Sequence, residues 1–241
     1  MKLKLTLEYD GTGFRGWARQ PGERTVEGVL REALAAVFPL WDGLAVAGRT
    51  DAGVHATGQV ASAGVEGGPP PERAAEALNA VLPADVAVLD AAESPAEFHA
   101  RFSARGRSYR YRVLARRTYS PLEARRALWW PRPVVLDALA GAAALLHGEH
   151  DFRAFTPTDT QHEVFGRDVT EARWHADGDS LEFTISADSF LRHMVRTLVG
   201  TMLEAGADAP DRIESLLDGS PRAEAGPTAP PWGLYLENVE Y

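Results

Sequence analysis

Residues 44–61 read LAVAGRTDAGVHATGQVA, and the apolar runs at the two ends of this stretch predict two short buried strands. The octapeptide between them, Gly48–His55, is then a tight connection that holds the carboxylate of Asp51 in a rigid frame. Arg49 lies two residues earlier, where a guanidinium would keep that carboxylate ionised and fixed in orientation. A carboxylate nucleophile needs such a setting. The alternative is an Asx turn, in which Asp51 only accepts hydrogen bonds from its own backbone.

Outward from this stretch, the hydrophobic pattern predicts strands and helices in both halves of the chain. Strands are expected at Lys2–Tyr9, Asp85–Asp90, Ser103–Leu114, Val164–His175, Ser180–Ala187 and Leu234–Tyr241, and helices from Thr25 to Pro39 and at Glu72–Leu82, Asp137–Leu146, Phe190–Glu204 and Asp211–Leu217. The fold class is therefore α+β. We expect two similar halves, each a mainly antiparallel sheet with helices on one face, and an active-site cleft between them. Residues 1–98 carry the Asp51 loop, and residues 99–241 carry an arginine- and tyrosine-rich strand and a basic helix.

The composition limits the class of protein. The 241 residues include no cysteine, which excludes disulfides, zinc–thiolate sites and thiol catalysis. The N-terminus has no signal-peptide core and no apolar run is long enough to cross a membrane, so we expect a cytoplasmic protein. A net charge of −9 argues against indiscriminate binding of nucleic acid.

The charge is nevertheless distributed unevenly. Between His99 and Arg132 the chain carries ten arginines and a single acid, Glu123. The arginines are at positions 101, 105, 107, 110, 112, 116, 117, 125, 126 and 132. A basic stripe on an acidic protein predicts a defined track for a polyanion.

A glycine pattern near the N-terminus, Gly11–Gly16, matches the G-x-G-x-x-G fingerprint of dinucleotide-binding folds. That fingerprint requires a helix to begin at its third glycine, and Pro21-Gly22 prevents one here. One interpretation is that the loop presents side chains suited to phosphates and base edges, namely Arg15, Trp17, Arg19 and Gln20. The alternative is a plain surface loop with Trp17 packed in the core. No cofactor is expected. His147 and His150 lack a third ligand, so no metal is expected either.

Two later segments carry further candidates. Along Arg107–Val113, alternation places Tyr109 and Tyr111 on one face and two arginines on the other. Such a strand suits base stacking with phosphates held nearby, or is a core strand with solvated arginines. On the predicted helix Phe190–Glu204, the polar face carries three basic residues, Arg192, His193 and Arg196. These are either solvated or face a phosphate or a carboxylate, Asp51 among the candidates.

Taken together, these segments resemble the tRNA pseudouridine synthase A family. The resemblance runs in order through Glu8–Gly11, Gly16-Trp17, Ala47–His55, Gly58–Val60, Leu78-Asn79, Leu82-Pro83, Phe98–Ser103, Tyr109–Tyr111, Gly148–Phe152, His193–Arg196, Gly200 and Gly233–Leu236. It implies a homodimer that isomerises uridine to pseudouridine at positions 38, 39 and 40 of the tRNA anticodon stem-loop, without cofactor or metal.

The resemblance also implies site residues. Asp51 stands at the catalytic aspartate, and Arg49 at the arginine of the same motif. Tyr109, rather than Tyr111, stands at the tyrosine that stacks on the target uracil, and Arg196 at the arginine that pairs with the catalytic carboxylate. The segment Thr156–Gly166 departs from the family pattern. Three other functions compete with this one: a synthase for other RNA positions, a non-catalytic RNA-binding protein, and a nucleotide-dependent oxidoreductase, which Pro21-Gly22 disfavours.

Overall fold

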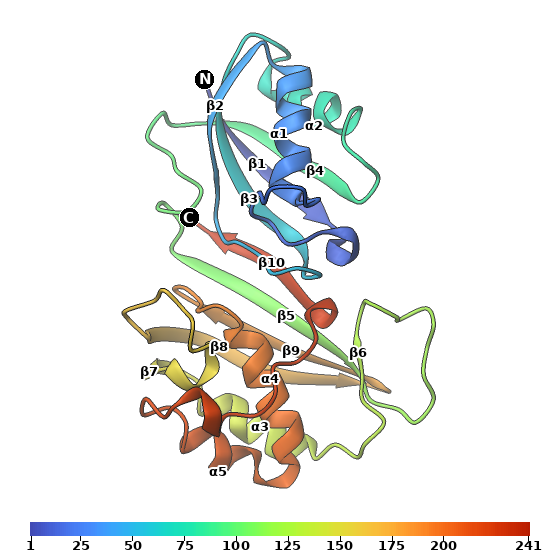
Figure 1. Ribbon diagram of the computed structural model, residues 1–241, viewed down its shortest axis with the longest axis vertical. Helices are drawn as coiled ribbons and strands as arrows, with labels where there is room; N and C mark the ends of the chain where they lie inside the picture. Colours follow the sequence, from blue (N-terminus) through green and yellow to red (C-terminus); the bar gives the residue numbers. More distant parts are fainter. The chain divides into compact units, whose positions relative to one another are not determined.

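A computed structural model describes all 241 residues, and the chain divides into two compact units. The first comprises Met1–Arg105 together with the C-terminal Tyr235–Tyr241, and the second comprises Gly106–Leu234. Figure 1 shows the elements of both units.

The first unit is a five-stranded sheet with two helices. Its elements are β1 (Lys2–Tyr9), α1 (Val26–Val37), β2 (Leu40–Val46), β3 (His55–Glu66), α2 (Pro71–Asn79), β4 (Val86–Ser94) and β10 (Leu234–Glu240). Strand β1 lies between β3 and β4, antiparallel to both, and β2 is also antiparallel to β3. Strand β10 adds to β3 in parallel, with Tyr235 opposite His55. The last strand in sequence therefore completes the sheet that carries the Asp51 loop.

Apolar residues at helical spacing explain the two helices of this unit. In α1, Val26, Leu30 and Leu34 are buried at intervals of four residues, so one face of the helix lies in the core. The predicted N-cap, Thr25, accepts a hydrogen bond from the Gly28 amide at 3.2 Å. Helix α2 begins at Pro71, where a proline is tolerated, and ends earlier than predicted, at Asn79.

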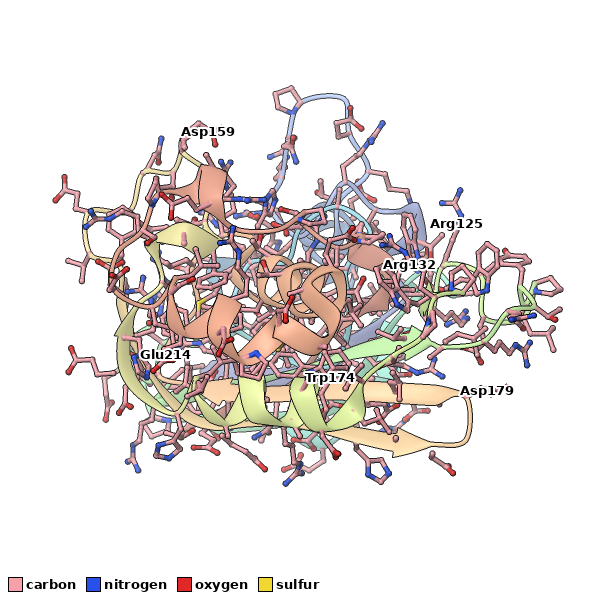
Figure 2. All side chains as sticks on the ribbon, turned by 90° about the horizontal axis from the view of Figure 1, so that it is seen from below. Arg125, Arg132, Asp159, Trp174, Asp179 and Glu214 are labelled. Carbon is pink, nitrogen blue, oxygen red and sulfur yellow. The ribbon has the colours of Figure 1, made fainter.

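The second unit is a mainly antiparallel sheet covered by helices. Its elements are β5 (Gly106–Leu114), β6 (Leu128–Trp129), α3 (Leu136–Ala144), β7 (Gly148–Asp151), β8 (Gly166–Asp177), β9 (Ser180–Ala187), α4 (Met194–Ala205) and α5 (Ala209–Glu214). The strand order is β5-β9-β8-β7, with β6 parallel to β5. Figure 2 shows the helices gathered on one side of β8 and β9. The predicted α+β class and mainly antiparallel pairing are confirmed in both units, whereas the two short strands β6 and β7 were not predicted.

The start of α4 corrects a prediction. A helix was expected from Phe190, but α4 begins at Met194, because His193 adopts the left-handed conformation with φ of +64°. Arg192 therefore lies outside the helix, where it forms an ion pair with Asp159. The expected polar face, with Arg192 and Arg196 one turn apart, does not exist.

Candidate functional site

The loop that carries Asp51 is held from beneath by a buried hydrogen-bond cluster. The Tyr9 hydroxyl and Thr50 Oγ1 are 2.7 Å apart, and Gln59 Nε2 donates to the carbonyl oxygen of Gly48 at 2.7 Å and to the Tyr9 hydroxyl at 3.3 Å. Tyr9 and Gln59 are 3% and 0% exposed, so these bonds are shielded from water. Burial raises the pKa of Tyr9 to about 12, against the lowering effect of its bonds to Thr50 and Gln59. These bonds fix Gly48 and Thr50, the residues on either side of Arg49; Thr50 also directly precedes Asp51.

The glycine-rich loop, residues 11–17, packs against the Asp51 loop backbone to backbone. The Trp17 amide donates to the Thr50 carbonyl at 3.0 Å, and the Gly53 amide donates to the Phe14 carbonyl at 3.2 Å. A Cβ on Gly11 would lie 2.0 Å from the carbonyl oxygen of Val54, a distance that no side chain could occupy. This close approach is the reason for the glycine. The pattern that resembled a dinucleotide fingerprint holds the Asp51 loop, and Trp17 is 2% exposed in the core, as the surface-loop alternative supposed.

Asp51 and Arg49 differ in their surroundings. Asp51 is half-buried, and its carbonyl accepts a hydrogen bond from the Val54 amide at 3.1 Å, which closes a tight turn. Arg49 is exposed. The guanidinium clamp that the sequence predicts for the Asp51 carboxylate stays a prediction. The backbone of this turn holds Asp51 in position.

His55, at the other end of the motif, anchors the loop to the last strand. Its Nδ1 accepts a hydrogen bond from the Gly11 amide at 3.0 Å. Its ring stacks on that of Tyr235, with centroids 4.7 Å apart and planes 21° from parallel. His55 is 2% exposed. It therefore links the glycine-rich loop, β3 and β10, and acts as a structural residue in this unit.

In the second unit, strand β5 shows the predicted alternation. Tyr109 and Tyr111 are 8% and 0% exposed, and their neighbours Arg110 and Arg112 lie on the other face. The ring of Tyr109 meets Phe190 edge to face at 4.9 Å. Arg110 Nη1 lies 2.8 Å from Glu182 Oε1, and Arg112 Nη1 lies 3.2 Å from Glu123 Oε2. Arg110 and Arg112, which the sequence predicts as candidate phosphate-binding residues, are each paired with an acid of the same unit.

Tyr111 holds a segment that lies against α4. Its hydroxyl donates to the carbonyl oxygen of Pro230 at 2.8 Å. Burial raises the pKa of Tyr111, while the positive charge of the nearby Arg196 opposes that rise. Alternation along the strand could not distinguish the roles of Tyr109 and Tyr111. This hydrogen bond gives Tyr111 a structural role.

The segment that receives this bond, Gly226–Pro230, is named the strap. The Nε of Arg196 donates to the Ala229 carbonyl at 2.8 Å, and the Ala229 amide donates to the Arg196 carbonyl at 3.0 Å. A Cβ on Gly200 would lie 1.9 Å from the carbonyl oxygen of Pro227, so the strap rests directly on the backbone of α4. Thr197 and Thr201 on α4 add hydrogen bonds to the strap residues Thr228 and Gly226, both at 3.0 Å. The strap fixes the guanidinium plane of Arg196.

The structure thus brings the candidates into two groups. Asp51 and Arg49 lie in the first unit, and Tyr109 and Arg196 lie in the second, where Tyr111 and the strap surround Arg196. The sequence did not identify Tyr9, Gln59, Tyr111 or the strap as supporting residues. Gln59 stood within the motif, whereas the strap carries no periodic signal. No group of three histidine, cysteine, aspartate or glutamate side chains is placed to hold a metal ion, and no helix has the length and apolar character of a membrane span.

Comparison with known proteins adds evidence that covers most of the chain. The family model described as tRNA pseudouridine synthase matches residues 6–103 and 142–241. The curated tRNA pseudouridine synthase A of Moorella thermoacetica is 44% identical, over 99% of this chain and 99% of its own length. The proteins of the same name from Myxococcus xanthus and Thermus thermophilus are each 43% identical over all of this chain, and cover 92% and 96% of their own lengths.

Proposed function

Because this chain belongs to the tRNA pseudouridine synthase A family, we propose that it isomerises uridine to pseudouridine at positions 38, 39 and 40 of the tRNA anticodon stem-loop. The protein is an isomerase of tRNA uridine, and tRNA is its substrate. We further propose that it acts in the cytoplasm as a homodimer. No cofactor or metal enters the proposal, because the reaction is an isomerisation with no net redox change.

The observation that carries the proposal is the rigid presentation of Asp51. The reaction breaks the bond between ribose C1′ and uracil N1, turns the base and joins C1′ to C5. The proton on C5 must leave, and N1 gains one. A carboxylate at a fixed position can attack the ribose or the base, or take a proton from the sugar, and each of these routes uses Asp51. The buried bonds of Thr50 and Gln59 support that role, because they limit the motion of the loop.

We assign supporting roles to the other candidates. Tyr109 stacks on the target uracil; its ring is fixed by the edge-to-face contact with Phe190, and its hydroxyl assists removal of the C5 proton. Arg196 pairs with the catalytic carboxylate; its orientation by the Ala229 carbonyl supports this assignment. Arg49 is exposed beside Asp51, and we propose that it binds the RNA backbone near the target uridine. The target base must leave its stack to reach these groups.

The test is release of tritium from uridine labelled at C5 in an unmodified tRNA transcript, without added cofactor or metal. Release is expected from a transcript with uridines at positions 38, 39 and 40, and should disappear when these three become cytidines. Undiminished release from the cytidine transcript would mean that other positions are modified. Binding of the transcript without any release would mean an RNA-binding protein without this activity.

A further inference from the structure

The segment between β5 and α3 carries a surface that the proposed chemistry does not use. We name residues 115–132 the arm. It contains five arginines, at positions 116, 117, 125, 126 and 132, and a single acid, Glu123, in a protein of net charge −9. Figure 1 shows it extending past the end of β5, around β6. It lies within residues 104–141, which the family model leaves unmatched.

The arm has a fixed structure. Strand β6 pairs in parallel with the end of β5, with Leu128 opposite Val113 and Trp129 opposite Leu114. The indole Nε1 of Trp129 donates to the carbonyl oxygen of Arg116 at 2.9 Å, which ties the two ends of the arm together. The arginines between these ends are therefore presented from an ordered backbone, and little conformational entropy would be lost when they bind a ligand.

The arginines of the arm differ in how far they are exposed. The only acid of the arm, Glu123, is paired with Arg112 of β5 at 3.2 Å. Arg132 pairs with Glu204 at 3.1 Å, and Arg116 lies 3.9 Å from Asp179. Arg117, Arg125 and Arg126 are exposed. In the view of Figure 2, Arg125 and Arg132 lie on the same side. Arg125 also has φ of +60°, a conformation that costs a non-glycine residue about 1 kcal/mol or more and is typical of functional positions.

Aromatic rings stand among these arginines. Tyr119 and Trp129 are 49% and 39% exposed, although both are large and apolar, and their rings meet edge to face at 5.7 Å. Exposed rings between arginines are the typical surface of single-stranded nucleic-acid sites, where bases stack on the rings and guanidiniums hold the phosphates. A second copy of the chain fits less well, because a two-fold axis through the arm would bring two positive surfaces together.

We propose that the arm binds the tRNA substrate away from the target uridine, with Arg117 and Arg125 on phosphates and Tyr119 against an unpaired base. Tyr109 and Leu114 are five residues apart on β5, and at about 3.3 Å per residue the arm begins roughly 17 Å along the strand from Tyr109. The arm therefore contributes affinity and site selection, not chemistry. This inference rests on the proposed function.

The experiment compares two doubly substituted proteins with equal loss of charge. The test variant is Arg117→Gln with Arg125→Gln. The control is Arg73→Gln with Arg173→Gln, which removes two arginines that are each 67% exposed and paired with a neighbouring acid on α2 and β8. In the test variant we expect KM for tRNA to rise about tenfold with kcat unchanged, and the log–log salt dependence of binding to lose about one unit per phosphate contact. The control should match the native protein. Tyr119→Ser should weaken binding without changing the salt dependence.

Three outcomes separate this inference from the proposed function. If the native protein releases tritium and the test variant behaves like the control, the inference is wrong and the proposed function stands. If the native protein releases no tritium but the test variant alone loses transcript binding, the arm binds RNA and the proposed function is wrong. If the test variant changes the sedimenting mass of the protein without affecting tRNA binding, the arm contacts a second copy, and the inference is overturned.

Discussion

Each unit of this protein uses one buried tyrosine to hold the segment that positions a candidate site residue. In the first unit, Tyr9 bonds to Thr50 and Gln59 beneath the Asp51 loop. In the second, Tyr111 bonds to Pro230 at the end of the strap that orients Arg196. Both hydroxyls are buried, and both tyrosine pKa values are raised for that reason. The tyrosines serve the same purpose, but the segments they hold are built differently.

The Asp51 loop is fixed mainly by the glycine-rich loop, which contacts it through the backbone. Gly11 and Gly16 let the glycine-rich loop approach it, and Gln59 binds the start of the same octapeptide. Arg196, in contrast, depends on the strap, which is held by side-chain hydroxyls and by close contacts at Gly200 and Gly226. We infer that the loop tolerates little change, whereas the strap can be loosened in steps.

The largest effect is expected for Gly11→Ala. The new methyl group would meet the Val54 carbonyl oxygen at 2.0 Å, and because that atom is backbone the Asp51 loop would have to move. We expect a loss of about 3 kcal/mol of unfolding free energy and at least about a hundredfold lower kcat, measured by urea denaturation and tritium release. Gly13→Ala is the control, since its methyl group meets only side-chain ends, Arg24 Nη1 at 3.3 Å and Asp85 Oδ2 at 3.7 Å. Equal effects of the two substitutions would contradict the close-packing account.

A smaller effect is expected for Gly200→Ala in the second unit. Its methyl group would lie 1.9 Å from the Pro227 carbonyl oxygen and would lift the strap from α4. Alanine favours the helix by about 1 kcal/mol, which offsets part of the clash, so we expect the loss of kcat to exceed the loss of stability. Gly141→Ala in α3, with only an ordinary contact to Pro210 at 3.4 Å, should leave kcat unchanged. A native kcat in Gly200→Ala would show that the strap does not position Arg196.

The two tyrosines provide a matched pair of milder changes. Tyr9→Phe leaves the Thr50 hydroxyl without its partner and removes one of the two hydrogen bonds that Gln59 Nε2 donates, whereas Tyr111→Phe leaves only the Pro230 carbonyl without a donor. We expect each to cost about 1–2 kcal/mol of unfolding free energy, with the larger value for Tyr9→Phe. Tyr111→Phe should lower kcat more than it raises KM for tRNA, because Arg196 loses its orientation. Calorimetry and steady-state kinetics would measure both; a KM effect alone would refute that role of Tyr111.

The raised pKa of Tyr9 gives a pH dependence. In the unfolded chain a tyrosine ionises near pH 10, whereas Tyr9 in the folded protein keeps its proton up to about pH 12. Unfolding therefore releases a proton between these values. The contribution of Tyr9 is fully present below pH 10 and is lost as the pH rises toward 12, by about 1.4 kcal/mol per unit. Denaturation at several pH values should show a shallower decline in Tyr9→Phe. An identical decline would argue against the buried hydroxyl as its source.

The smallest effect is expected at Arg192. It pairs with Asp159 at the surface rather than standing beside Arg196 on a helix. Exposed pairs of this kind contribute about 0–1 kcal/mol, so Arg192→Ala should change the unfolding free energy and tritium release only slightly. A large loss of kcat would mean that Arg192 takes part in the site despite its position outside α4.

The sequence predicted most of the secondary structure because long apolar patterns determine it. Lys2–Tyr9 and Ser180–Ala187 were predicted with their observed bounds. The start of α4 was missed, because apolar residues at helical spacing continue through Phe190 and Leu191 while the backbone turns left-handed at His193. The two-residue β6 is too short to show a period.

The sequence predicted the surroundings of some candidate residues better than those of others. Asp51 stands in one contiguous motif, so its loop could be described before the structure was known. That Arg49 clamps Asp51 stays a prediction; the structure adds that the Arg49 side chain is exposed, which spacing does not give. The strap, Tyr111 and Arg196 come together from three distant segments, and no local pattern predicts such contacts. The functional division at residue 98 and the roles of the four site residues stay proposals.

We propose that the rigidly held Asp51 performs the chemistry and contributes little to the binding of tRNA. The measurement is tritium release from C5-labelled tRNA by native protein and by Asp51→Asn, with binding of the same transcript measured in parallel. We predict release by the native protein, no detectable release by the variant, and affinities for tRNA within about tenfold of each other. Turnover by Asp51→Asn at a rate near that of the native protein would contradict the account.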